Sequence, residues 1–313
     1  MFVVSRELGR LVRLRHGVAM WPELQADGMS SGTLRRYLDT GALVRLHPGI
    51  YRFGTAPDTL ESRCVAACLA DDRVVVSHLT AARLHHCRRV GDDDVVHLIV
   101  RGDRVPLSSG VVTHRTNALA PGDVEQRIDH IRVTTALRTT FDLASVLGDL
   151  DLESVIEQLL DRRRITVPQL HAIGRRLRAP GRTGSARFCR VVGGRDGWLR
   201  PADSHLEVRV WRALSGCGIT GLVRQHPVVL DDGREVHVDI ADPGCGWALE
   251  IDHVTWHGGR ADAQSDKIRD RALRRADWHV ERVTDAEVEH SLAVLVLELH
   301  QSLLSRRAIR MAA

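Results

Sequence analysis

Four acidic residues in the last third of the chain have the types and spacing that phosphodiester chemistry requires. Glu207 lies near the start of a helix expected over about 204–214, Asp239 lies on an expected strand, and Glu250 and Asp252 lie on the next one. Carboxylate oxygens are the ligands that Mg²⁺ prefers, and converging anions repel unless a cation lies between them. The sequence therefore predicts Mg²⁺ or Mn²⁺ held by Glu207, Asp239 and Glu250, where it can activate water for phosphodiester hydrolysis.

The hydrophobic pattern predicts the elements that position these acids. Residues 236–240 alternate apolar and polar side chains, which predicts a strand with Val236, Val238 and Ile240 on one face and Asp239 on the other. Residues 247–252 alternate in the same way, with Glu250 and Asp252 on one side. The rest of this region predicts a helix over about 261–276, a strand over 279–283 and a helix over about 285–304.

Two further residues are candidates for proton transfer at such a site. His257 lies five residues after Asp252, on the expected loop, where it can position a water, carry a proton or contact the scissile phosphate. Lys267, the single lysine among 44 basic residues, lies on the helix that follows. Each also has a purely structural interpretation, His257 as a loop residue and Lys267 as a solvated helix residue.

The acids have structural alternatives as well. Ser204 precedes Glu207 by three residues, which is the spacing of a capping box, so this carboxylate could instead cap its helix. Asp239 could be a solvent-facing strand residue, although its pairing with Glu250 on the adjacent strand favours a site. On the next helix, salt bridges within the helix are expected among Asp266, Arg269 and Asp270.

The N-terminal segment predicts a second functional surface. Residues 5–15, the segment after Trp21 and residues 33–41 have the apolar spacing, caps and breakers of three short helices. Residues 43–52 alternate around the turn His47-Pro48-Gly49, which predicts a β-hairpin. Three helices followed by a hairpin is the plan of a winged helix-turn-helix domain.

That plan has a mechanism for binding double-stranded DNA. A recognition helix enters the major groove, where arginine contacts guanine edges or phosphates, and the wing reaches the backbone or the minor groove. The expected DNA contacts are Thr33, Arg35, Arg36, Tyr37, Arg45, His47 and Arg52. The alternative is a three-helix domain for protein contacts with solvated arginines. Charge favours DNA, because residues 1–55 hold eight arginines and four acids, whereas residues 200–313 hold 15 basic and 18 acidic residues.

Composition limits the class of protein. The 313 residues are 43% hydrophobic and 27% charged, which excludes a disordered or fibrous chain and allows two or three domains. The excess of arginine over lysine is explained by a GC-rich genome and decides nothing alone. Six cysteines form no CxxC pair, and no apolar stretch approaches 18 residues. A reduced, cytoplasmic protein without a membrane segment is expected.

Specific runs of residues cover the predicted wing and the middle of the chain. The wing has the pattern of Gly41, Arg45, Pro48, Gly49 and Tyr51 within HGVAMWPELQADGMSSGTLRRYLDTGALVRLHPGIYRF. Further along lie SHLTAARLHH, HLIVRGDR, GVVTHRT and IRVTTALRTTFDLA. Over about residues 8–178, with helices expected at 151–164 and after Pro168, the chain resembles the AbiEi family of antitoxins. The resemblance implies an operator-binding autorepressor, with a nucleotidyltransferase-like toxin as a partner.

The C-terminal segments SHLE, VHVDIADP, WALEIDHVTWH and SDKIRDRALRRADWHVERVT follow one another over about 203–304. In this order they resemble the PD-(D/E)XK endonuclease superfamily and, within it, the very-short-patch-repair (Vsr)-like group. The resemblance implies that Asp239 and Glu250 bind the metal and that Glu207 is the acid of the first helix. Two positions depart from the pattern, because Asp252 stands in place of a lysine and His253 in place of the usual glycine. Lys267 is a candidate for the missing cation.

The sequence thus predicts a mixed α/β protein in four parts. These are a winged helix-turn-helix (1–55), an AbiEi-like mixed α/β middle domain (56–178), a Gly- and Arg-rich linker (179–202) and a Vsr-like domain with a restriction-endonuclease-like mixed sheet flanked by helices (203–313). The leading hypothesis is a DNA-binding, metal-dependent DNA endonuclease or nickase. The alternative is a transcriptional autorepressor and antitoxin whose nuclease fold is degenerate and serves contacts, which the mildly acidic last third favours.

Overall fold

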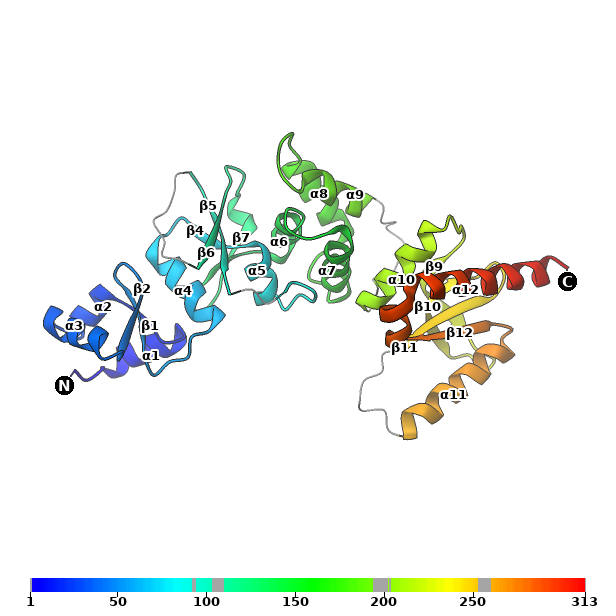
Figure 1. Ribbon diagram of the computed structural model, residues 1–313, viewed down its shortest axis with the longest axis horizontal. Coiled ribbons are helices and arrows are strands. Elements are labelled where there is room, and N and C mark those ends of the chain that lie inside the picture. Colours follow the sequence, from blue (N-terminus) through cyan, green and yellow to red (C-terminus); the bar gives the residue numbers. More distant parts are fainter. Residues whose placement is uncertain are drawn as a thin grey trace. The chain divides into compact units, whose positions relative to one another are not determined.

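The computed structural model describes residues 2–91, 94–102, 110–193, 202, 204–252 and 260–312, with side chains left out over 260–267 (Figure 1). The predicted mixed α/β class is confirmed, since the described residues form twelve α-helices and three sheets with no closed barrel. The chain divides into two compact units. The N-terminal unit comprises Met1–Leu147 and Pro168–Cys189, and the C-terminal unit comprises Gly148–Val167 and Arg190–Ala313.

The N-terminal unit begins with the helices and hairpin expected from the sequence. They are α1 (Arg6–Leu14), α2 (Trp21–Ala26), α3 (Ser31–Asp39), β2 (Leu43–His47) and β3 (Ile50–Phe53), and a short strand β1 (Val18–Met20) completes a sheet of order β1-β3-β2. Ser30 caps α3 because its hydroxyl accepts from the Thr33 amide at 3.2 Å. Leu24, Leu43 and Tyr51 pack in the small core beneath these elements.

The remainder of this unit surrounds a five-stranded sheet of order β6-β5-β4-β8-β7. Its strands are β4 (Val74–Val76), β5 (Val96–Val100), β6 (Val111–Arg115), β7 (Val124–Gln126) and β8 (Arg132–Thr134). Its helices are α4 (Leu60–Ala70), α5 (His78–Leu84), α6 (Ala136–Leu143) and α8 (Val167–Leu177), with a 3₁₀ turn at Pro121–Asp123. The side chains of α4 and of β4, β5 and β8 form its core.

Part of the segment expected to be a linker is helical. Helix α9 (Ser185–Gly193) begins beside α8, and the Phe188 side chain is fully buried. Its ring lies 5.0 Å from the Phe141 ring, centroid to centroid, and contacts the position that a Cβ on Gly174 would occupy. The glycines and arginines of this stretch give no sequence signal for a helix, but the buried ring of Phe188 holds α9 in place. Burial of such a ring contributes about 2 kcal/mol to the free energy of unfolding.

The C-terminal unit is built on a four-stranded sheet of order β12-β11-β10-β9. Its elements are α7 (Asp149–Asp161), α10 (His205–Gly216), β9 (Val223–Val229), β10 (Glu235–Asp242), β11 (Trp247–Asp252), α11 (Arg260–Arg275), β12 (His279–Thr284) and α12 (Asp285–Ala312). Strands β9, β10 and β11 are antiparallel neighbours, and α11 connects β11 to the parallel strand β12. In Figure 1, α10 and α12 cover one face of the sheet and α11 covers the other.

Helix α7 belongs to this C-terminal unit, although the sequence places it in the middle domain. Glu157 of α7 forms a buried ion pair with Arg224 of β9, with 3.0 Å between Oε1 and Nη2. The two compact units therefore interleave along the chain. Among the described helices, none combines the length and the hydropathy that a membrane span requires.

Candidate functional site

The amide of Gln225 joins two of the predicted metal ligands. Its Nε2 donates to Glu207 Oε2 and to Asp239 Oδ1, both at 3.0 Å. Glu207 comes from the first turn of α10, where Ser204 caps the helix as expected, and Asp239 comes from β10. Glu207 is 4% exposed and Gln225 is 8% exposed. The sequence interpretation missed both strand β9 and this glutamine, because the run VRQHPVV shows no alternation of apolar and polar residues.

The second carboxylate oxygen of Asp239 accepts a hydrogen bond from β11 at a point where the backbones of β10 and β11 no longer pair. Backbone pairing between β10 and β11 covers only Ile240–Asp242 and Trp247–Leu249. Beyond that point, Asp239 Oδ2 accepts from the Ile251 amide at 2.8 Å. A carboxylate that accepts one hydrogen bond on each oxygen is fixed in orientation, which a metal ligand needs.

Gln225 has an unusual backbone within its strand. Its φ is +47°, and pairing between β9 and β10 passes from Val238–His226 to Ile240–Arg224 without a pair at Gln225. On the neighbouring strand, Val238 packs in the core beneath α11, whereas Ile240 packs in the core with α10 and α12. The expected common face for these residues is therefore wrong. Such backbone outliers cluster at functional sites.

Glu250 is buried, and it pairs with the guanidinium of Arg269. Its Oε1 accepts from Arg269 Nη2 at 2.8 Å, and the carboxylate is only 9% exposed. Burial raises the pKa of Glu250 to about 7; the charges of Asp239 and Asp252 act in the same direction, whereas Arg269 and Arg282 oppose it. The Asp239 charge is therefore close enough to act on Glu250, as a shared site requires.

Arg269 and Asp270 of α11 pair with residues of neighbouring strands, whereas the side chain of Asp266, the third residue of the predicted set, lies outside the described residues. Arg269 reaches Glu250 and also donates to the His237 carbonyl. Asp270 accepts from Arg282 Nη2 of β12 at 2.8 Å, and Arg282 Nη1 donates to Asp252 Oδ1 at 2.7 Å. Glu250 lies on β11 and Arg282 on its parallel neighbour β12, so the partners of Arg269 and Asp270 come from the two strands that α11 connects.

Two of the predicted catalytic residues cannot be placed. His257 and the neighbouring His253 lie outside the described residues, and the described part of α11 leaves out the Lys267 side chain. Over the described ranges there is no group of three or more His, Cys, Asp or Glu side chains already arranged around one metal position. The donor chemistry itself fits a hard cation, because Glu207, Asp239 and Glu250 offer only carboxylate oxygens and two of them are buried.

Because the pKa of Glu250 is raised in the folded protein, the free energy of unfolding should depend on pH. Its folded pKa, about 7, lies above the ordinary value of 4.5, so the folded state holds more protons between these values. The Glu250 contribution to the free energy of unfolding is therefore full below pH 4.5 and falls by roughly 3 kcal/mol as the pH rises to 7.

Glu250→Gln should remove this pH dependence. Urea unfolding at pH 5 and pH 8 measures it through tryptophan fluorescence, because Trp211, Trp247 and Trp278 lie in the same unit. The wild-type protein should lose more stability over this interval than the variant. Equal losses in both proteins would mean that Glu250 does not hold its proton in the folded state.

The predicted DNA-binding residues of α3 divide into exposed and anchored side chains. Arg35 and Arg36 are exposed, and the Arg36 guanidinium lies 5.7 Å from the centre of the Tyr37 ring. Thr33 lies within the N-terminal cap, with 3.0 Å between its Oγ1 and the hydroxyl of Ser30. The Tyr37 hydroxyl accepts from the backbone amide of Phe2 at 3.2 Å. Of the four predicted contacts on α3, the two arginines are therefore the exposed ones.

The hairpin presents one of its three predicted contacts. Arg45 is exposed, with its guanidinium 5.8 Å from the centre of the Tyr51 ring. His47 is 5% exposed and Arg52 is 9% exposed, and Arg52 donates to the Ala56 carbonyl. Burial lowers the pKa of His47, so its imidazole is neutral at physiological pH. The exposed basic side chains of the expected DNA surface are Arg35, Arg36 and Arg45.

Comparisons with known proteins do not assign a family. No family model matches the chain, and no curated protein is significantly similar to it. Among solved structures, the chain is similar to the RV2827C protein from Mycobacterium tuberculosis, with 17% identity and a TM-score of 0.40. The match covers 64% of this chain and 86% of that protein. This similarity is too low to carry an argument about activity, and the AbiEi-like and Vsr-like resemblances stay predictions.

Proposed function

We propose that this protein binds double-stranded DNA through α3 and the β2–β3 hairpin and cleaves a DNA phosphodiester bond at the Glu207–Gln225–Asp239–Glu250 site. The observation that carries this proposal is the bridge made by Gln225, whose amide joins Glu207 and Asp239 at 3.0 Å. This amide binds one buried and one half-buried carboxylate, next to a third carboxylate with a pKa of about 7, and such a cluster of acids with a perturbed pKa is typical of a functional site.

A divalent cation, Mg²⁺ or Mn²⁺, would be held by Asp239 and Glu250 with Glu207 completing the ligand set. When bound, it supplies a polarised water and stabilises negative charge on the phosphate. Within the chain, Gln225 orients two of the acids, and Arg269 holds the Glu250 carboxylate. His257 and Lys267 are proposed to assist proton transfer. The resemblance to PD-(D/E)XK endonucleases supports Asp239 and Glu250 as metal ligands and Glu207 as the acid of the first helix.

Plasmid cleavage tests the proposed activity. Purified full-length protein should convert supercoiled plasmid to nicked or linear DNA in the presence of Mg²⁺ or Mn²⁺. Addition of EDTA should stop the reaction, because the three carboxylates alone provide no Lewis acid to polarise the phosphate and the attacking water. Plasmid that stays supercoiled under conditions in which a gel shift shows bound DNA would refute the nuclease proposal.

One observation favours a second, non-catalytic function. Arg269 already neutralises Glu250, and Asp252, at the position of the expected lysine, is paired with Arg282. A site closed by its own ion pairs suits an operator-binding autorepressor and antitoxin, with a nucleotidyltransferase-like toxin as the proposed partner. Specific binding to the DNA upstream of the protein's own gene, without cleavage, would support this second function.

The exposed arginines of α3 provide a test of the DNA surface that applies to both functions. Arg35→Ala combined with Arg36→Ala should weaken DNA binding by about tenfold or more at low salt. The slope of log K against log salt concentration should become shallower by about 2, because two phosphate contacts are lost. Fluorescence anisotropy with a labelled duplex at several salt concentrations measures both quantities.

The matched control for that experiment is Arg10→Ala, which removes an exposed arginine from α1 of the same unit. It should leave the affinity within about twofold of wild type. Equal affinities for the double variant and the wild-type protein would exclude α3 as the DNA-contacting helix.

A further inference from the structure

The N-terminal unit contains a cavity of about 640 Å³ that the proposed DNA surface does not use. It lies where the ends of β5 and β6, helix α6 and the segment after α8 meet. Its walls combine apolar side chains (Ile99, Phe141 and Val146) with a set of polar and charged groups. Sites for small ligands have this size and this mixture of apolar wall and few polar groups.

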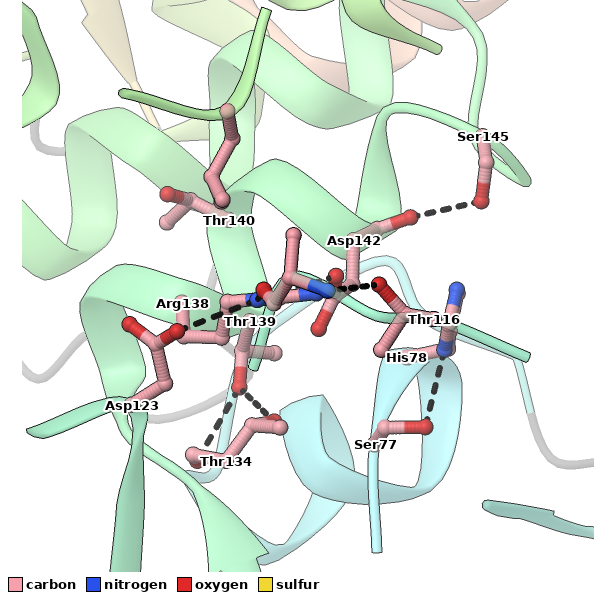
Figure 2. Close-up of polar contacts among 12 residues, drawn as sticks. Ser77, His78, Thr116, Asp123, Thr134, Arg138, Thr139, Thr140, Asp142 and Ser145 are labelled. Carbon is pink, nitrogen blue, oxygen red and sulfur yellow. Dashed lines mark hydrogen bonds and ion pairs between the residues drawn. The ribbon is translucent and has the colours of Figure 1, made fainter. Parts of the chain in front are cut away.

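The polar floor of the cavity is a buried chain of ion pairs. Arg138 of α6 is 3% exposed and lies between Asp123 and Asp142, as Figure 2 shows. Its Nη1 is 3.1 Å from Asp123 Oδ2, and its Nε donates to Asp142 Oδ1 at 2.9 Å. Arg176 of α8 contributes a second cation to Asp123. Arg138 and Asp142, the two members of this chain that line the cavity, are therefore paired with each other, and Arg138 is also paired with Asp123 behind them.

One acceptor in this floor is unused. Asp142 lines the cavity, and its buried Oδ2 has no hydrogen-bond partner among the described residues. Burial raises the pKa of Asp142 to about 7, with Arg138 acting in the opposite direction. A buried carboxylate oxygen without a donor costs free energy, so its retention beside a cavity indicates a missing hydrogen-bond donor.

The histidines at the edge of the cavity add no charge. The His78 and His114 rings are stacked, with centroids 3.5 Å apart, and Ser77 Oγ lies 2.8 Å from His78 Nδ1. Burial lowers the pKa of His78 to about 2 and that of His114 to about 4, and each is also lowered by a neighbouring histidine. Both rings are therefore neutral at physiological pH and form a flat, polar-edged wall.

The rim of the cavity is cationic. Arg115, at the end of β6, is exposed, and Arg182 approaches from the segment after α8. Thr116, Asn117 and Thr183 add neutral hydrogen-bonding groups beside them. Two guanidinium groups with hydroxyl and amide neighbours match the oxygens of a phosphate group.

We propose that this cavity binds a small phosphorylated ligand of nucleotide size, a nucleoside 5′-monophosphate. Its phosphate contacts Arg115 and Arg182 at the rim, its base packs on the Phe141 wall, and an N–H or O–H of the ligand donates to Asp142 Oδ2. This ligand satisfies the unused acceptor and the cationic rim together, whereas inorganic phosphate satisfies the rim alone.

Isothermal titration calorimetry of the full-length protein tests the proposal with AMP, GMP, CMP and UMP in turn. At least one of them should bind with a dissociation constant below about 1 mM. The matching nucleoside and inorganic phosphate should bind at least about tenfold more weakly, because each lacks half of the contacts. Arg115→Ala and Arg182→Ala should each weaken nucleotide binding by about tenfold.

Two further variants complete the design. Arg175→Ala, an exposed arginine on α8 that does not line the cavity, should leave the affinity unchanged. Asp142→Asn should weaken binding of the nucleotide and leave binding of inorganic phosphate unchanged. Absence of heat with all four nucleotides overturns the proposal, as does nucleotide binding that Arg115→Ala and Arg182→Ala do not alter. If these two variants instead weaken binding of a short DNA duplex, the rim contacts DNA and the assignment of a small ligand is wrong.

Discussion

Asp239→Asn is expected to lower the rate of metal-dependent plasmid cleavage by roughly 10³-fold, because charge stabilisation by a bound cation contributes several kcal/mol to the barrier. The substitution removes a negative charge while keeping the side-chain shape. Asp239 accepts one hydrogen bond on each oxygen, from Gln225 Nε2 and from the Ile251 amide. In asparagine one of these oxygens becomes an NH₂ group, which cannot accept, so one of the two hydrogen bonds is lost. Circular dichroism and a thermal melt must therefore show that the variant is folded before its rate is interpreted.

The control is Asp232→Asn, which makes the same chemical change on the exposed turn between β9 and β10. Asp232 pairs only with nearby Arg234 among the contacts described, so its replacement should leave cleavage within about twofold of wild type. DNA binding by Asp239→Asn should also be unchanged, because the arginines of α3 lie in the other unit. Unaltered cleavage by Asp239→Asn and by Glu250→Gln would show that the nuclease site lies elsewhere or that the activity is a contaminant.

Gln225→Ala separates orientation of the acids from their charge. It keeps all three carboxylates and removes the amide that joins Glu207 to Asp239. Residues that orient metal ligands typically affect affinity or activity by 10- to 100-fold, so the rate should fall by about that factor. The concentration of Mg²⁺ needed for half-maximal rate should rise in parallel, which a purely structural role would not produce.

The largest expected effect on stability comes from Glu157→Ala. Glu157 is fully buried on α7, its Oε1 lies 3.0 Å from Arg224 Nη2, and its Oε2 accepts from the Ala202 amide at 3.2 Å. Arg224 is 4% exposed, and its guanidinium lies 5.3 Å from the centre of the Trp211 ring. Removing Glu157 leaves a buried guanidinium without its counter-charge, which costs about 3–5 kcal/mol of unfolding free energy.

Denaturant unfolding followed by tryptophan fluorescence measures this loss in the C-terminal unit. The matched control is Glu153→Ala on the same helix, which pairs with the partly exposed Arg212 at 3.1 Å. That change should cost no more than about 1 kcal/mol. Similar small losses for both variants would mean that α7 does not pack in this unit. Because Arg224 precedes Gln225, Glu157→Ala should also slow plasmid cleavage.

The secondary structure of both candidate functional regions could be predicted from local pattern. Helix α3 followed from its serine cap and apolar spacing, and β11 followed from the alternation of Leu249 and Ile251 with Glu250 and Asp252. Helix caps and the alternation of buried and exposed residues depend on a few neighbouring residues, so they can be recognised in the sequence. Helix α9 and strand β9 escaped prediction, because glycine and arginine dominate the first region and the second contains a left-handed residue at Gln225.

The identities of the acids were determined by the sequence alone, but their partners were decided by tertiary structure. Gln225, Arg269 and Arg282 meet Asp239, Glu250 and Asp252 across 14, 19 and 30 positions of the chain. The same packing buries His47 and Arg52 and joins α7 to the C-terminal unit. Local patterns record which face of an element is buried, whereas the choice of neighbour depends on how strands and helices assemble, and that information is spread over the whole fold.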